Sequence, residues 1–131
     1  MMNQEEAVMA DSSPSDLKVR TRRFALRVIR LYGALPTSVV AQTLGKQVLR
    51  SGTSVGAYYR EACRTRSDAE FISLIEGGLK ELEETIYWFE LIVDAELFAA
   101  ERLADLMTEA DELMAILTAS VKTVKSRTGR A

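Results

Sequence analysis

The chain has 131 residues, of which 47% are hydrophobic and 27% charged, with a formal net charge of −2 at pH 7. This composition excludes a wholly disordered chain and suffices for one domain with its own core. The sequence contains no histidine, which excludes Ser-His-Asp and Cys-His catalysis and the Glu-x-x-His metal sites of di-iron bundles. Cys63 is the single cysteine, so no intramolecular disulfide forms and we expect a reducing, cytoplasmic location.

The first 15 residues, MMNQEEAVMADSSPS, are polar and acidic and predict a disordered tail. They lack the basic and apolar regions of a signal peptide. No apolar run in the chain reaches the roughly 18 residues that a membrane span needs. We therefore expect a soluble protein without a membrane partner.

Residues 16–125 predict a single domain of four amphipathic helices. In the first, Leu17, Phe24, Val28, Leu31 and Leu35 recur at helical spacing and form an apolar face that Ala25, Ile29 and Tyr32 widen. Gly33 and Pro36 end this helix.

The second helix starts near Thr37 or Ser38, either of which can cap its free amide groups, and its inner seam runs through Val40, Leu44, Val48, Val55, Tyr58 and Ala62. The third opens at a capping box formed by Ser67 and Glu70. The fourth runs to about Lys125, and residues 126–131 read as a polar tail. Four such helices with short connections predict an all-α, up-down-up-down antiparallel four-helix bundle.

The run SGTSVGA at residues 51–57 interrupts the second helix with small residues that favour a loop. Val48, Val55 and Ala62 nevertheless keep a heptad spacing across it, which predicts a continuous helix. Gly52 and Gly56 stand one turn apart and permit close approach of another helix, of the same bundle or of another subunit. The run lacks the Gly-Lys-Ser/Thr ending and the preceding strand of a phosphate-binding loop.

Charge is divided unequally along the chain. Residues 17–66 hold eleven lysines and arginines against one acid, Glu61, a net +10, whereas residues 67–125 hold four against fourteen acids, a net −10. Three interpretations are open: head-to-tail docking of one copy on the next, binding of nucleic acid through its phosphates, or ion pairs between the two halves of one bundle. The candidate basic face consists of Arg20, Arg23, Arg27, Arg30, Lys46, Arg50, Arg60 and Arg64.

Two further residues are candidates for contacts between helices or subunits. Glu61 stands among cations, and we expect it to be partly buried and paired with an arginine. Trp88 belongs to an apolar surface on the third helix that is wider than one seam requires and that can fill the core or lie between subunits. The acids of the third helix alternate with Lys80 at ion-pair spacing, so we do not interpret them as a catalytic dyad.

The run LGKQVLRSGTSVGAYYREACRTRSDAEFISLIEGGLKELEETIYWFELI resembles the bacterial four-helix-bundle proteins named after the intervening sequences of 23S ribosomal RNA. The resemblance covers about residues 24–125. The matching positions are Gln47, Arg50, Ser54, Glu61, Ser67, Glu70, Phe71, Gly77, Glu81 and Leu82. Tyr58, Tyr59, Arg60, Ala62 and Gly78 differ from the family pattern and indicate a divergent branch.

The resemblance implies a homo-oligomeric, often pentameric, bundle without enzymatic activity, and an association with nucleic acid. Together with the charge pattern it predicts a structural or protein-binding adaptor. The alternative is an RNA-associated accessory protein that binds the phosphate backbone through its first two helices. We expect no catalytic residue, cofactor, metal site or small-molecule substrate.

Overall fold

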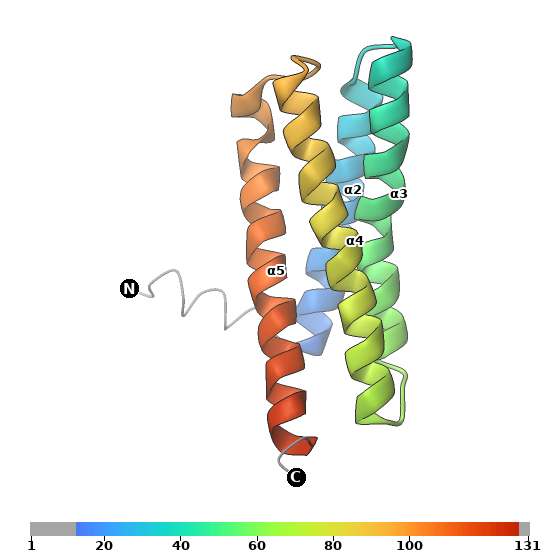
Figure 1. Ribbon diagram of the computed structural model, residues 1–131, viewed down its shortest axis with the longest axis vertical. Helices are drawn as coiled ribbons and strands as arrows, with labels where there is room; N and C mark the ends of the chain where they lie inside the picture. Colours follow the sequence, from blue (N-terminus) through green and yellow to red (C-terminus); the bar gives the residue numbers. More distant parts are fainter. Residues whose placement is uncertain (1–12, 129–131) are drawn as a thin grey trace, which may run out of the picture.

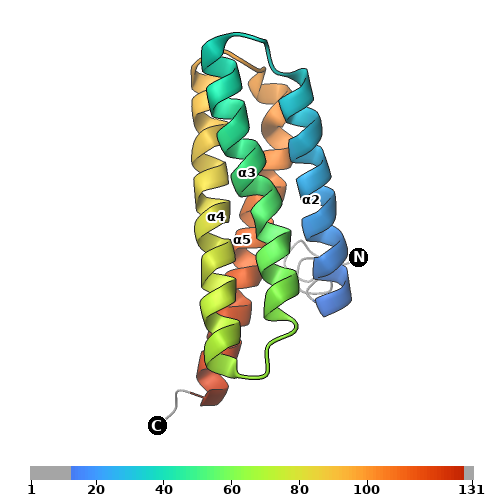
Figure 2. The same ribbon diagram turned by 90° about the vertical axis from the view of Figure 1, so that its right-hand side faces the viewer.

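The computed structural model describes residues 13–128, which form four helices. They are α2 (Pro14–Ala34), α3 (Val39–Ala62), α4 (Asp68–Asp94) and α5 (Ala100–Thr128). The helices run alternately up and down, as Figures 1 and 2 show. The predicted all-α four-helix bundle is confirmed.

The helices are arranged so that each packs on the next along the chain, and α5 returns to α2. The packing of α3 on α4 is the most extensive, and that of α5 on α2 is the least. Within the described residues the backbones of α2 and α4 do not approach each other closely, so these two helices occupy opposite corners of the bundle and meet only through core side chains. Their outward faces therefore point in opposite directions.

Three serines start helices by accepting a backbone N–H in the first turn. The hydroxyl of Ser38 accepts from Ala41, and that of Ser67 accepts from Glu70, at 3.2 and 3.1 Å, as the sequence predicted. Ser13 caps α2 in the same way, followed by a proline in the first turn.

The boundaries of the two predicted tails differ from the structure. Helix α2 already begins at Pro14, because Ser13 is a cap and not part of a tail. Helix α5 continues through Ser126 and Arg127, beyond the expected end at 125. The remaining parts of the two predicted tails, residues 1–12 and 129–131, lie outside the described residues.

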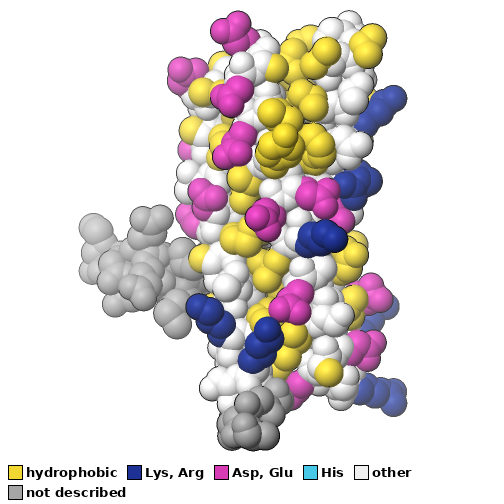
Figure 3. All heavy atoms as spheres, in the orientation of Figure 1, with side chains coloured by type: hydrophobic (Ala, Val, Ile, Leu, Met, Phe, Trp, Pro, Cys, Tyr) yellow, Lys and Arg dark blue, Asp and Glu magenta, His cyan; other side chains and the backbone are white. Residues whose placement is uncertain are grey.

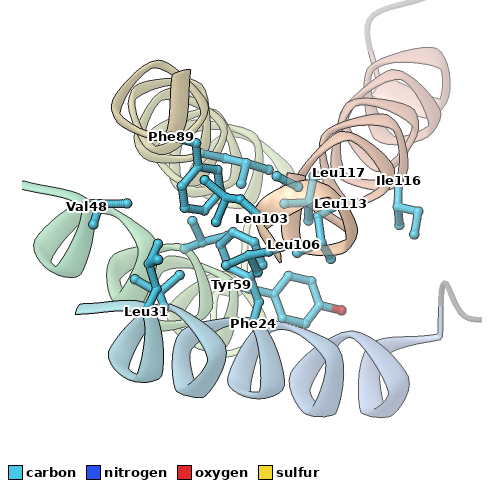
Figure 4. Packing of buried hydrophobic residues seen from close by; sticks show 14 of the residues in the cluster. Phe24, Leu31, Val48, Tyr59, Phe89, Leu103, Leu106, Leu113, Ile116 and Leu117 are labelled. Carbon is cyan, nitrogen blue, oxygen red and sulfur yellow. The ribbon is translucent and has the colours of Figure 1, made fainter. Parts of the chain in front are cut away.

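The core is a continuous apolar cluster to which all four helices contribute (Figure 4). Phe24 of α2 and Phe89 of α4 meet edge to face at its centre, with ring centroids 6.3 Å apart. Leu103, Leu106 and Leu113 of α5 close the cluster. Two predicted core positions are wrong: Ile29 is 47% exposed and Val40 is 56% exposed.

Both errors have a rotational cause. At the start of α3 the buried positions are Ala41, Gly45 and Val48, which places Val40 about 100° away from the core direction. In α2, Ile29 follows the buried Val28 and turns outward for the same reason. Beside Val40, the inward positions are therefore occupied by the small residues Ala41 and Gly45.

The run at residues 51–57 is helical throughout, as predicted. Its glycines face α2 of the same chain. A Cβ on Gly52 would lie 2.8 Å from Val28 Cγ2, and one on Gly56 would lie 3.1 Å from Thr21 Oγ1. The two helices therefore approach more closely than side chains at these positions would allow.

A buried polar contact joins α3 to α4. Thr85 Oγ1 is hydrogen-bonded to Ser51 Oγ and to the carbonyl oxygen of Glu81, each at 2.8 Å. Both hydroxyl side chains are fully buried. Because an unpaired buried hydroxyl is costly, this contact fixes the register of the two helices.

Candidate functional site

Four residues of the predicted basic face lie on α2, and the structure separates Arg20 from the other three. Arg20 turns toward α5, where its Nε donates to Glu109 at 2.9 Å and its Nη2 donates to Glu109 and Glu112 at 2.7 Å each. Its side chain is only 13% exposed. The hydrogen bond to Glu109, followed by the other contacts with the two carboxylates, holds the pKa of Arg20 above its ordinary value. Arg20 therefore links α2 to α5 through its two carboxylate partners and is unavailable to an external anion.

Arg50 makes a second bridge between the basic and acidic halves. It donates from α3 to Glu84 at 2.9 Å and to Glu81 at 3.1 Å on α4. The hydrogen bond to Glu84 is the main cause that raises the pKa of Arg50. At Arg20 and Arg50, pairing of the two halves within one bundle is thus observed.

The other predicted cations point away from the core. Arg23, Arg30, Lys46, Arg60 and Arg64 are exposed, and Arg27 is half-buried. Within residues 13–128, none of these six side chains forms an ion pair.

The outward side of α2 mixes arginine with apolar side chains. We name it the α2 face and define it as Val19, Arg22, Arg23, Leu26, Ile29 and Arg30. All six are exposed, and the three apolar ones have 40 to 47% of their surface accessible. The sequence reading missed Val19 and Leu26, although their spacing of seven residues signals a second apolar stripe.

The outward side of α4 carries the opposite charge. The α4 face consists of Glu76, Lys80, Glu83, Tyr87, Glu90 and Asp94, all exposed. Figure 3 looks onto the side of the bundle where α4 lies in front: acidic side chains are scattered over it, and hydrophobic ones gather toward its upper part. The bundle thus presents a basic face and an acidic face on opposite corners.

Trp88 lies at the edge of the α4 face. Its ring packs beside Tyr87 with centroids 5.2 Å apart, and its indole N–H is buried without an acceptor among the described residues. At the same end of the bundle, Val39 and Val40 are 82% and 56% exposed. Trp88 is thus a buried, unpaired hydrogen-bond donor beside the exposed Tyr87.

The remaining predicted contact residues have separate locations. Glu61 is exposed, and within the described part of one chain it has no ion-pair partner, so its expected burial is not found there. Its place in a contact between subunits stays a prediction. Gly52 and Gly56 serve the packing of α2 on α3 described above.

Cys63 and Tyr59 lie together at the end of α3. Cys63 is half-buried and Tyr59 is 4% exposed. Burial, and after it the contact with Cys63, raises the pKa of Tyr59. The part of the chain that the structure describes holds no group of histidine, cysteine and acidic residues that could bind a metal ion.

The protein belongs to the class of antiparallel four-helix bundles, and its sequence contains one cysteine and no histidine. Within that class, this chain belongs to the 23S rRNA-intervening sequence protein family, whose model matches residues 15–119. The resemblance noted in the sequence is therefore confirmed.

A solved structure supports the same assignment. The chain is similar to a protein of unknown function from the S23 ribosomal protein family of Bacteroides thetaiotaomicron VPI-5482, with 35% sequence identity and a TM-score of 0.78. The similarity covers 83% of this chain and 97% of that one. No curated protein matches the chain. Within residues 13–128, every helix is too short or too polar to cross a membrane.

Proposed function

We propose that this protein is a non-enzymatic, homo-oligomeric four-helix bundle that serves as a structural or protein-binding adaptor. The observation that carries the proposal is the placement of the α2 face and the α4 face on opposite corners of one bundle. In the proposed assembly, the α2 face of one copy packs on the α4 face of the next.

The two faces are complementary in charge and in apolar content. Three exposed arginines on the α2 face meet four exposed acids on the α4 face. Val19, Leu26 and Ile29 supply apolar area on one side, and Tyr87 supplies it on the other. Charge complementarity favours one orientation and one partner, while apolar burial supplies affinity. Because the contact joins two different surfaces, it closes into a ring when the rotation between copies permits, and the family resemblance favours five copies.

Trp88 gives the proposed contact a second support. A buried N–H without an acceptor costs about 1–3 kcal/mol, and a carbonyl or carboxylate of a neighbouring copy would satisfy it. Tryptophan, tyrosine and arginine are the residues that dominate binding energy in protein interfaces. The edge of the α4 face combines the first two, and the α2 face supplies the third.

A second candidate function is binding of RNA through the exposed cations of α2 and α3. The exposed arginines and Lys46 favour it, because they can reach phosphate groups. The name of the matching family refers to 23S rRNA. The acidic α4 face repels a polyanion, which restricts such binding to one side of the bundle.

Charge reversal tests the assembly. In the variant Arg23→Glu/Arg30→Glu, like charges face each other across the proposed contact, and light scattering should show monomers where the unmodified protein forms one defined oligomer. Adding Glu83→Arg/Glu90→Arg in the same chain restores opposite charges and should restore the oligomer. The matched control, Arg60→Glu/Arg64→Glu, makes the same charge change at the end of α3 and just beyond it and should leave the mass unchanged.

The same variants separate assembly from RNA binding. If RNA binding is the function, affinity for a short RNA falls steeply with salt and is lost in Arg23→Glu/Arg30→Glu, and restoring the oligomer does not bring it back. If light scattering shows the unmodified protein to be a monomer, or shows the same mass for the unmodified protein and Arg23→Glu/Arg30→Glu, the assembly proposed here is contradicted.

A further inference from the structure

One corner of the bundle is incomplete. Arg20 marks the level at which α2 faces Glu109 and Glu112 of α5. From Arg20, α2 extends only about 9 Å further to Pro14, whereas α5 extends about 24 Å beyond Glu112 to Thr128. Figures 1 and 2 both show the red end of α5 reaching past the blue start of α2. Within residues 13–128, the last turns of α5 therefore lack a helix beside them at this corner.

A groove of about 1270 Å³ lies at this corner. We name it the α2–α5 groove. It runs between the start of α2 and the second half of α5, and the end of α3 and the first turn of α4 complete it. Its apolar lining includes Leu17, Cys63, Phe71, Ile116 and Val124. Cys63 and Phe71 are half-buried, so part of this apolar surface remains accessible in the described residues.

We propose that residues 1–12 of the same chain pack in the α2–α5 groove, with Ala7, Val8 and Met9 against its apolar lining. This segment joins the bundle at Ser13, and the next residue, Pro14, itself lines the groove. Twelve residues reach at most about 40 Å when extended, which exceeds the roughly 15 Å of α5 that extends past α2. The covalent link gives the segment a local concentration in the millimolar range, so weak contacts suffice.

Charged residues line the groove in nearly equal numbers: the exposed arginines Arg66 and Arg127 stand beside the acids Asp68, Asp111 and Glu112. Glu112 pairs with Arg20 at 2.7 Å, and Asp68 lies 3.7 Å from Arg127. Arg66 forms no ion pair within residues 13–128 and can meet one of the acids Glu5, Glu6 and Asp11 that flank the triplet. The apolar triplet and its covalent link to the groove, rather than charge, therefore carry the proposal. The family match begins at residue 15, so the proposal concerns this chain and not the family.

The single cysteine provides the test in the full-length chain. In the variant Val8→Cys, the new thiol should form an intramolecular disulfide with Cys63, because bonding requires the two Cα atoms to come within about 7 Å. In the control Asn3→Cys, the thiol stands outside the apolar triplet. A freely moving tail would give the two variants similar effective concentrations in a glutathione buffer, since these depend only weakly on chain length. Docking should raise the effective concentration of the two thiols in Val8→Cys about tenfold above that in the control Asn3→Cys.

A second measurement needs no new cysteine. In Val8→Asp/Met9→Asp the charged side chains cannot enter an apolar lining, and Cys63 should react with a thiol reagent about tenfold faster than in the unmodified protein. The control Asn3→Asp/Gln4→Glu adds the same charge outside the triplet and should leave the rate unchanged. Equal rates in all three proteins, or a disulfide of Val8→Cys that links two chains, would overturn the proposal.

Discussion

Helix α2 is held by its two neighbours in different ways. Against α3 it packs closely, because Gly52 and Gly56 carry no side chain where Val28 and Thr21 of α2 approach. Against α5 it is held by Arg20, which reaches across to two carboxylates. The first seam depends on shape and the second on charge, so substitutions should affect them by different mechanisms.

The two seams also differ in continuity. The contact of α2 with α3 is extensive, whereas its contact with α5 is limited and leaves the α2–α5 groove at one end. A close-packed seam tolerates no added volume, while a seam bridged by long side chains leaves space beside the bridge. The glycines thus fix where α2 lies, and Arg20 determines how far α5 stays from it.

The largest effect is expected from breaking the charged seam. Arg20→Ala leaves Glu109 and Glu112, which are 18% and 27% exposed, without their cation and should lower the free energy of unfolding by about 2–3 kcal/mol. Arg50→Ala is the control: it removes a comparable bridge from a side chain that is 51% exposed, and the loss should stay within about 1 kcal/mol. Urea denaturation measures both, and equal losses would show that burial does not set the strength of the α2–α5 seam.

A smaller loss is expected at the close-packed seam. The Cβ of Gly52→Ala would lie 2.8 and 2.9 Å from the two γ-carbons of Val28, a buried and stiff side chain. Overpacking should outweigh the gain in helix propensity and cost about 1–2 kcal/mol. Gly33→Ala is the control, because nothing lies within 4 Å of the added carbon, and it should stabilise the protein by up to about 1 kcal/mol. A Gly52→Ala variant as stable as Gly33→Ala would mean that the two helices can separate freely.

The smallest effect is expected at Tyr59, a buried residue near the end of α3 that lines the α2–α5 groove. Its burial raises its pKa, so its contribution to stability is complete below the ordinary tyrosine pKa of about 10 and is lost as pH rises toward the folded-state pKa. Tyr59→Phe cannot ionise, and its melting temperature should fall less steeply between pH 9 and 11 than that of the unmodified protein. Identical slopes in the two proteins would indicate that the groove end of the bundle admits water freely.

Much of the fold could be predicted because it depends on local signals. The caps at Ser38 and Ser67 follow from hydroxyl groups that satisfy free amides within one turn. The helical state of residues 51–57 followed from the spacing of Val48 and Val55, which outweighs the low propensity of glycine. The error at Val40 arose where the small residues Ala41 and Gly45 face the core, because hydrophobicity alone does not identify a position filled by close backbone approach. Ile29 adjoins the buried Val28, and its hydrophobicity does not reveal that it turns outward.

The candidate site was less predictable, because side chains distant in sequence determine it. Eight cations read as one basic face from their charge and spacing, yet the structure engages Arg20 and Arg50 with acids of α5 and α4. Their partners lie 31 to 92 residues away along the chain, so no helical spacing reveals them. Val19 and Leu26 are seven residues apart and can be recognised in the sequence as an outward apolar stripe. The more regular spacing of the inward apolar residues of the same helix obscured this signal.

By itself, the sequence determined that the chain forms four amphipathic helices, where most of them start, and that its two halves carry opposite charge. These properties depend on periodicity, capping and composition, all of which act within a few residues. Only the tertiary structure decided which cations remain exposed, that α2 and α4 present opposite faces, and that α5 extends beyond the start of α2 at one corner. Those properties depend on how helices of unequal length align around a shared core, which is settled by contacts between residues far apart in the chain.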